Sequence, residues 1–270
     1  MQNDRLKILF IGDIVGKPGR KLASVLIPGL KDKYGIDFTI ANGENASGGI
    51  GLVPTTAGEL FASGIDCLTL GNHTWEKKEI LSIIDDKRIV RPLNYPPGTP
   101  GEGSRVYQIP GSIAVGVINL TGRIFVQGLD CPFRSLDKEL EKIKKECNIV
   151  IVDIHAEATS EKAALAWYAD GRVTAVIGTH THVQTADERV LPGGTAFITD
   201  AGMTGAKNSV IGIEKELAIR KFLTMLPVRF EVAAGPAVFC GAVITCDPET
   251  GRSLGIERIY YDEETQAFKK

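Results

Sequence analysis

The sequence predicts an α/β protein, because short apolar runs of strand length alternate along the chain with amphipathic segments of helix length. Several of these runs are rich in β-branched residues and are followed at once by glycine, asparagine or aspartate. The chain has 270 residues, of which 43% are hydrophobic, so it can bury a large core. We therefore expect one α/β domain over residues 1–270.

The first half of the chain contains three strand and helix units. An apolar run comes first, and the segment after it places Leu22, Leu26 and Leu30 at helical spacing. A later helix begins with Pro54, a residue that the first helical turn tolerates. The predicted strands are 6–12, 37–42 and 66–70, and the predicted helices are 19–34, 54–63 and 75–84.

The second half continues this alternation and ends in strands. The segment 135–147 is an amphipathic helix whose Leu136, Leu140 and Ile143 face inward, while its charged face is solvated. Other predicted elements are strands at 106–109, 113–120, 149–154, 173–177 and 195–199, and helices at 160–168 and 215–226. The last three strands, 228–232, 238–246 and 254–261, are expected to form an antiparallel second sheet.

Two stretches lack any regular pattern. Residues 91–103 contain too much proline and glycine for regular structure, and residues 121–134 are also irregular. The first of them is either a plain connector or a lid over a cleft.

Charge and cysteine content restrict the class of protein. The chain carries 31 basic and 33 acidic residues without a block of like charge, which argues against a partner that is long nucleic acid. Its five cysteines are an odd number with no C-x-x-C pair, as expected in a reducing compartment. The amino terminus has no apolar signal core, and no run approaches the roughly 18 apolar residues of a membrane span. We expect a soluble cytoplasmic protein that does not bind membranes.

The four histidines are unusually placed, since each follows a strand-like run. His73 and His155 come after the runs 67–72 and 149–154, and His180 and His182 come after the run 173–177. In an extended segment residues two apart point to the same side, so the last two imidazoles could face one cleft. Taken alone, a short H-x-H pair is also compatible with two ordinary polar loop residues.

Oxygen ligands follow two other strand-like runs and also end the run that precedes His73. Asp13, the pair Glu44 and Asn45, and Asn72 all stand where a run ends. Together with the histidines they are the O and N ligands of a site for two neighbouring metal ions. Glu44 would be costly to bury without a partner, and two cations would keep it ionised. Asp13 and Asn45 taken singly also fit ordinary turn residues.

The glycine-rich turn after the first strand is not a nucleotide-binding P-loop. The string G-D-I-V-G-K has three residues between its glycines where a P-loop needs four. Pro18 also replaces the Ser or Thr that would hold magnesium.

The order of these residues resembles the calcineurin-like metallophosphoesterase superfamily over nearly the whole chain. The motifs that carry the resemblance are Asp13, Glu44-Asn45, Gly71-Asn72-His73, His155 and Gly178-x-His180-x-His182. The strings G-E-N-A and D-A-G-M-T-G are similar to the bacterial YmdB-like branch, which hydrolyses 2′,3′-cyclic nucleotides. The sequence departs from the wider superfamily at three places: Val15 replaces a histidine, Glu44-Asn45 replaces G-D-x-x-D, and Thr74 replaces a carboxylate.

The resemblance implies a fold and a mechanism. The fold is a sandwich of two mixed β-sheets with helices outside, and two metal ions share an activated water that attacks phosphorus in line. One ion would be held by Asp13, Asn45 and His182, the other by Asn72, His155 and His180. Glu44 would bridge them, and His73 would protonate the departing ribose oxygen. Asp200 would orient a ligating histidine or serve only as a turn residue.

The implied activity is hydrolysis of 2′,3′-cyclic nucleoside monophosphates by a phosphoric diester hydrolase. Iron or manganese is favoured by the resemblance, and zinc is compatible with the same ligands. Two alternatives use the same residues: a phosphomonoesterase or other phosphodiesterase, and a metal-dependent nucleotide-binding regulator with little turnover. A homo-oligomer is compatible with all three.

Overall fold

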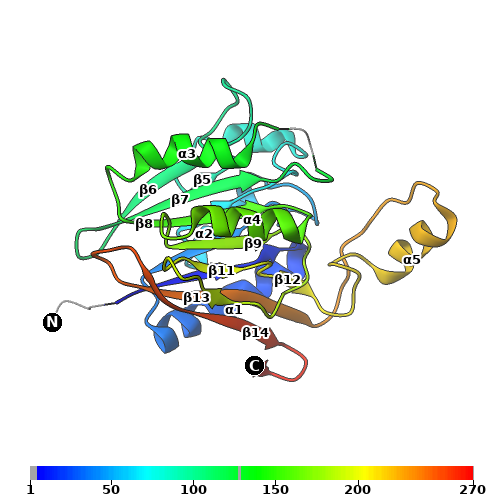
Figure 1. Ribbon diagram of the computed structural model, residues 1–270. Helices are drawn as coiled ribbons and strands as arrows, with labels where there is room; N and C mark the ends of the chain where they lie inside the picture. Colours follow the sequence, from blue (N-terminus) through cyan, green and yellow to red (C-terminus); the bar gives the residue numbers. More distant parts are fainter. Residues whose placement is uncertain (1–4, 127–128, 270) are drawn as a thin grey trace.

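The computed structural model describes residues 5–126 and 129–269, and its architecture is two β-sheets packed face to face with helices outside (Figure 1). This arrangement confirms the predicted sandwich of two mixed sheets. No helix among the described residues is long and apolar enough to cross a bilayer.

The first sheet combines parallel strands from the amino-terminal half with antiparallel strands from the carboxyl-terminal end. Its order is β15 (Ala267–Lys269), β14 (Ser253–Asp262), β13 (Ala237–Cys246), β1 (Leu6–Ile11), β3 (Phe38–Asn42), β4 (Cys67–Thr69) and β5 (Ile89–Val90). β1, β3, β4 and β5 run parallel, whereas β13 pairs antiparallel with β1. Two short strands, β2 (Asp13–Ile14) and β12 (Met203–Ala206), pair with each other, and β12 also pairs with β13.

The second sheet is formed by the middle of the chain. Its order is β10 (Arg189–Val190), β11 (Ala196–Ile198), β9 (Ala175–Thr179), β8 (Ile149–His155), β7 (Ile113–Thr121) and β6 (Ser104–Ile109). The four central strands run parallel, so their carboxyl ends lie at one edge. The strands β6 and β7 confirm the two strands predicted for this region, and they pair antiparallel.

Helices cover the outer face of each sheet. α1 (Gly16–Tyr34) and α2 (Pro54–Ala62) pack against the first sheet, and α3 (Pro132–Ile143) and α4 (Thr159–Ala169) pack against the second. The alternation along β1 illustrates the layering, because Ile8 and Phe10 face the space between the sheets while Leu9 and Ile11 face the helices. α5 (Lys215–Thr224) lies apart from these layers (Figure 1).

Three predictions about elements are wrong. β13 and β14 were expected in a second sheet, but they extend the sheet of β1, since β13 pairs with that strand over its whole length. Residues 228–232 form no strand; only Val232 makes an isolated bridge, to Ile213. Residues 75–84 form turns and a short 3-10 helix, η1 (Lys78–Ser82), in which the amides of Ile80 and Ile83 donate to carbonyls three residues back.

Smaller differences concern short elements and boundaries. Sequence periodicity missed five strands of only two to four residues each: β2, β5, β10, β12 and β15. Helix α1 begins three residues earlier than predicted and α3 begins at Pro132. Residues 91–103 are irregular as predicted and are held by Arg91, whose guanidinium donates to the carbonyls of Thr99, Pro100 and Gly101. Within the stretch 121–134, residues 127–128 lie outside the described residues.

Candidate active site

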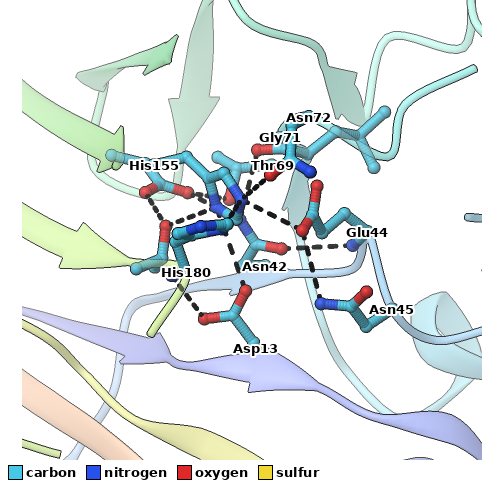
Figure 2. Close-up of polar contacts among 12 residues, drawn as sticks. Asp13, Asn42, Glu44, Asn45, Thr69, Gly71, Asn72, His155 and His180 are labelled. Carbon is cyan, nitrogen blue, oxygen red and sulfur yellow. Dashed lines mark hydrogen bonds and ion pairs between the residues drawn. The ribbon is translucent and has the colours of Figure 1, made fainter. Parts of the chain in front are cut away.

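The candidate site lies where strand ends of the two sheets meet (Figure 2). Asp13, Glu44, Asn45 and Asn72 follow or begin strands of the first sheet, whereas His155, His180 and His182 come from the ends of β8 and β9 in the second. The structure therefore brings the seven predicted ligands into one region, but from two sheets that face each other. His155 is the last residue of its strand rather than the residue after it.

His155 is the centre of the tightest cluster. Its Nε2 lies 2.9 Å from Asn72 Oδ1, 3.0 Å from Glu44 Oε1 and 3.1 Å from His180 Nδ1. Glu44, His155 and His180 each offer one ligand atom, and these three atoms all lie within 4.8 Å of one another. The side chains of Glu44 and His155 are almost completely buried.

This spacing fits a metal ion. Two ligands that are each about 2.1 Å from a cation and at right angles lie about 3 Å apart, which matches the distances around His155. Gly71 packs directly against this cluster, since a Cβ added to it would collide with the ring of His155 and with Glu44. The position therefore excludes every residue with a side chain and leaves room for the ligands alone.

Hydrogen bonds outside the cluster orient both histidine rings. Asp153 Oδ1 accepts the Thr179 hydroxyl at 2.7 Å, so that hydroxyl is free to accept from His155 Nδ1 at 2.9 Å. His180 Nε2 lies 3.1 Å from the Glu157 carboxylate. These contacts direct Nε2 of His155 and Nδ1 of His180 toward the cluster, which is how carboxylates orient metal-bound histidines.

Asp13, Asn45 and His182 form a looser half of the site. His182 Nε2 lies 3.1 Å from Asn45 Nδ2 and 3.8 Å from Asp13 Oδ1, while its Nδ1 bonds the carbonyl of Ile211. Asp13 Oδ1 is buried and accepts no hydrogen bond from any described residue, which suits a cation. Asn45 donates from Nδ2 to Glu44 as well, so ligation through its oxygen would require the amide to turn.

The charges of the tight cluster depend on one another. Burial would raise the pKa of Glu44, but the adjacent His155 charge lowers it to about 2. Burial would lower the pKa of His155, but Glu44 raises it to about 9. For His180, burial and then the charge of His155 lower the pKa to about 3. Without metal, Glu44 and His155 therefore form a buried ion pair beside a neutral imidazole. Burial also raises the pKa of Asp13 in the looser half.

The segment that carries His180 and His182 is a turn and not an extended strand end. Both residues have positive φ, at 101° and 64°, a conformation that is costly for residues other than glycine and occurs at functional sites. Thr181 between them donates to Asp200 from its amide and its hydroxyl, at 3.1 and 2.7 Å. The two imidazoles do line one pocket, as predicted, but the extended geometry assumed for them is wrong.

Asp200 supports this turn together with a lysine that the sequence reading missed. Lys162 is fully buried in α4, and its Nζ lies 2.6 Å from Asp200 Oδ2. The other oxygen of Asp200 accepts the amide of Gly202 at 2.8 Å. Asp200 is thus both a turn residue and a support for the histidine segment, although it contacts Thr181 and not an imidazole.

His73 lies at the edge of the cluster. Its backbone amide donates to Glu44 Oε2 at 2.9 Å, and its side chain is 31% exposed. The ring Nδ1 lies 3.9 Å from Glu76 Oε1 and has no hydrogen bond among the described residues. This position leaves the imidazole available to a molecule in the adjacent pocket.

The pocket beside the cluster has a volume of about 590 Å³. Its polar wall contains Glu44, Asn45, His73, Glu157, His180 and His182. Its apolar wall contains Val15, Ile50, Ile211, Ile213 and Phe230. Pockets of this size that combine an apolar wall with a few converging polar groups bind small organic molecules.

Comparison with known proteins adds a family and close relatives. A family model described as "YmdB-like protein" matches residues 9–259. The chain is 50% identical over 265 residues to the 2′,3′-cyclic-nucleotide 2′-phosphodiesterase of Bacillus subtilis strain 168, a match that covers 98% of this chain and 100% of that protein.

Two solved structures are similar along nearly their whole length. A hypothetical protein from Thermus thermophilus superposes with a TM-score of 0.90 at 44% identity, covering 96% of this chain and 100% of that one. A novel phosphatase from Mycoplasma pneumoniae superposes with a TM-score of 0.91 at 37% identity, covering 97% and 95%.

Proposed function

The chain belongs to the YmdB-like family and has a metallophosphoesterase-type fold, and from this premise we propose that it is a metal-dependent phosphodiesterase acting on 2′,3′-cyclic nucleotides. The observation that carries the proposal is the convergence of Asn72, Glu44 and His180 on His155 Nε2 beside a pocket of nucleotide size. The similarity to the Bacillus subtilis enzyme supports the choice of substrate class.

In this proposal the two halves of the site hold one metal ion each. His155, His180 and Asn72 would ligate the ion of the tight half, and Asp13, Asn45 and His182 the ion of the looser half. Glu44 would bridge the ions. Bound there, such a pair of ions supplies an activated water and neutralises charge on the phosphate.

His73 is proposed as the general acid. Its ring faces the pocket and bonds none of the other candidate ligands among the described residues, so it can give a proton to the ribose oxygen that leaves phosphorus. Replacing it with alanine should leave both metals bound and reduce turnover of the cyclic nucleotide by about 10²–10⁴-fold. The loss should be much smaller for a p-nitrophenyl ester, whose leaving group needs no proton.

A direct assay tests the proposal and its enzymatic alternative. The purified protein loaded with Mn²⁺ is incubated with 2′,3′-cyclic AMP, 3′,5′-cyclic AMP and p-nitrophenyl phosphate, and products are separated by chromatography. The proposal expects the first to be hydrolysed fastest. Preferred hydrolysis of p-nitrophenyl phosphate would favour a phosphomonoesterase. Tight nucleotide binding with no metal-dependent product would favour a nucleotide-binding regulatory protein with little turnover.

The ligand set is compatible with iron or manganese, and with zinc, and elemental analysis of protein purified without added metal distinguishes them. Two equivalents of metal per chain are expected. We also propose a single domain over residues 1–270 that works in the cytoplasm.

A further inference from the structure

Two hollows beside the first turns of α1 are lined by the same three basic side chains, Lys17, Arg20 and Lys21. The larger hollow has a volume of about 720 Å³ and is also lined by Gly48 and residues 232–236. The smaller one has a volume of about 560 Å³ and extends along α1 toward the end of α2. We call these two adjoining hollows the basic groove.

The positive charge of the basic groove is only partly neutralised. Arg20 lies 2.7 Å from the Glu59 carboxylate and donates to the Ala46 carbonyl at 2.5 Å. Lys17 and Lys21 are exposed, and within residues 5–126 and 129–269 neither ammonium group has an ion-pair partner. The groove therefore presents two free positive charges to a ligand.

The arrangement of these two lysines lowers the stability of α1. Lys17 and Lys21 are four residues apart, so their like charges repel one another on the same face of the helix. The helix dipole also disfavours cations near the first turn, which here contains no acidic residue to offset them. Local features that reduce stability without a structural gain are expected at functional sites. The charges therefore indicate a binding site for an anion.

The basic groove is continuous with the catalytic pocket at Gly48. This glycine lines both the larger hollow and the pocket that contains the candidate metal ligands. A Cβ added to it would meet no atom within 4 Å, so the space next to its backbone is open. A ligand can therefore extend from the catalytic pocket over Gly48 into the basic groove.

Hydrogen bonds fix the basic groove relative to the candidate metal ligands. The Gly16 amide at the start of α1 donates to the carbonyl of Asn45 at 3.0 Å. The Arg20 guanidinium holds Ala46, the next residue along the same loop. Phosphates bound by Lys17 would thus lie at a defined distance from the site at which a terminal phosphate reacts.

A free 2′,3′-cyclic mononucleotide would leave the basic groove unused, because its single phosphate lies at the metal site in the proposed function. An RNA strand that ends in a 2′,3′-cyclic phosphate has further phosphates, joined to the terminal ribose through its 5′ oxygen. We propose, resting on the proposed function, that the substrate is the 3′ end of a short single-stranded RNA of this kind. Its terminal ring would enter the catalytic pocket, and its upstream phosphates would contact Lys17 and Lys21.

Reaction at the terminal ring leaves the rest of the strand intact. A water oxygen bonds to the ring phosphorus, the bond from phosphorus to one ribose oxygen breaks, and that oxygen takes a proton from His73. The proton that the water releases replaces the one given by His73, so the step consumes one water. The product is the same strand with a terminal phosphate monoester. Lys17 and Lys21 contact only phosphates that do not react and are therefore positioning residues.

The size and charge of the basic groove fit a few nucleotides. Proteins that bind single strands without sequence preference use a positively charged groove along the backbone. Two free lysines supply such contacts for a short segment only, in keeping with the chain's net charge of −2. A terminal nucleotide must also be free of a complementary strand to enter a pocket of about 590 Å³.

Another hollow, of about 490 Å³, also shares lining residues with the catalytic pocket, but it lacks free charge. Lys207 and Lys269 lie 3.0 and 2.8 Å from the same carboxylate, that of Asp262. Arg258 lies 3.6 Å from Glu188. Because its cations are already paired, this hollow is the less favourable path for a phosphate backbone.

A length series of substrates tests the proposal through activity. Oligoadenylates of one to six nucleotides, each ending in a 2′,3′-cyclic phosphate, are hydrolysed by metal-loaded protein and kcat/KM is measured. In the wild type kcat/KM should rise with length to about tenfold above that of 2′,3′-cyclic AMP, as two exposed charge contacts can provide. In the variant K17Q/K21Q the ratio of long to short substrate should fall toward one.

The matched control is K138Q/K142Q. These two lysines are also four apart and exposed on a helix, α3, which covers the other sheet. The variant loses the same charge, so a general electrostatic effect would appear in it as well. It should keep the wild-type dependence on substrate length.

Binding measured without turnover gives a second readout. A 5′-fluorescein-labelled RNA hexanucleotide with a 3′-phosphate, which has no ring to hydrolyse, is titrated with each protein between about 50 and 300 mM KCl. Each phosphate contact to a single strand contributes about −0.7 to the slope of log K against log salt. The slope of K17Q/K21Q should therefore be shallower by about 1.4 than those of the wild type and K138Q/K142Q.

The outcomes separate this proposal from the proposed function. Hydrolysis of 2′,3′-cyclic AMP with no gain from added nucleotides would overturn the RNA substrate and leave the phosphodiesterase in place. A length dependence that K17Q/K21Q and K138Q/K142Q reduce equally would also overturn it. Lysine-dependent binding of the hexanucleotide without hydrolysis of any cyclic phosphate would support the groove and contradict the proposed function.

Discussion

The two halves of the candidate site differ in how completely the protein has prepared them. Around His155 Nε2 the other candidate ligand atoms lie at 2.9 to 3.1 Å, and both imidazoles are fixed by partners outside the cluster. Around His182 the Asp13 carboxylate lies farther away, at 3.8 Å from Nε2, and one of its oxygens has no donor among the described residues. The Asn45 amide, at 3.1 Å, presents its nitrogen and so faces the wrong way for ligation. The first half is rigid and the second must adjust.

This difference indicates that the metal ions of the two halves would have different roles. A preorganised site loses little conformational freedom on binding, so the tight half should retain its ion more strongly. His182 and Asn45 line the open pocket, where an adjustable ion could follow the substrate. Variants of the two halves should therefore differ in how much metal they retain.

Glu44→Gln should damage both halves at once. Glutamine keeps the shape and one oxygen ligand, but it removes the charge that holds two cations together. We expect loss of at least one metal and a fall in activity of at least about a thousandfold, or about 4 kcal/mol. Metal analysis alongside turnover measures this. A variant with two bound metals and ordinary turnover would exclude the bridging role.

Single alanine variants should separate the halves. His155→Ala removes the centre of the tight cluster, so this protein should retain no metal after desalting. His182→Ala touches only the looser half and should retain one equivalent per chain, with activity strongly reduced. Inductively coupled plasma mass spectrometry gives the stoichiometries. Equal metal contents in the two variants would contradict the contrast.

Asp153→Asn should weaken the tight half selectively. Asp153 Oδ2 accepts bonds from Thr69 and Asn42, at 2.5 and 3.1 Å, and an amide nitrogen there would face two donors. The resulting shift should loosen the Thr179 contact to His155 and reduce metal affinity about 10–100-fold. Titration calorimetry with Mn²⁺ should show the tighter binding event weakened and the weaker one unchanged. Thr39→Val, which alters a buried hydroxyl that bonds none of the described residues, is the control.

Metal uptake by the tight half should depend on pH. The pKa of His155 is raised to about 9, so a metal must displace a proton from this ring at any lower pH. Affinity should therefore rise about tenfold per pH unit between about pH 6 and 8.5 and level off above about 9. Mn²⁺ binding measured across this range tests the slope. An affinity independent of pH would show that His155 is neutral before the metal arrives.

The candidate ligands at the strand ends could be predicted from the sequence, but the residues that hold these ligands in position could not. Apolar runs followed by Asp13, Glu44, Asn72 and the histidines are visible in a short window. Asp153 lies within such a run and Lys162 within a helix, and nothing local distinguishes them from other strand or helix residues.

Long-range pairing also escaped prediction. The sheet that β13 joins depends on the strand with which it pairs, here β1. The alternation of residue types along β13 would be the same in either sheet and so does not identify the partner strand. The turn at His180 and His182 likewise involves residues that lie outside its own sequence window, since the His180 amide donates to Asp13 and the Thr181 amide donates to Asp200.

The position of the site at the seam between the sheets has a consequence for how the protein matures. Glu44 and Asn72 belong to one sheet and His155 and His180 to the other, so no half of the fold can assemble the cluster alone. An ion bound between these residues would link the two sheets. By mass action, a ligand at about 100 times its Kd stabilises the folded state by about 2.7 kcal/mol. Metal binding would thus occur only after the two sheets have packed together, and it would then stabilise the folded state.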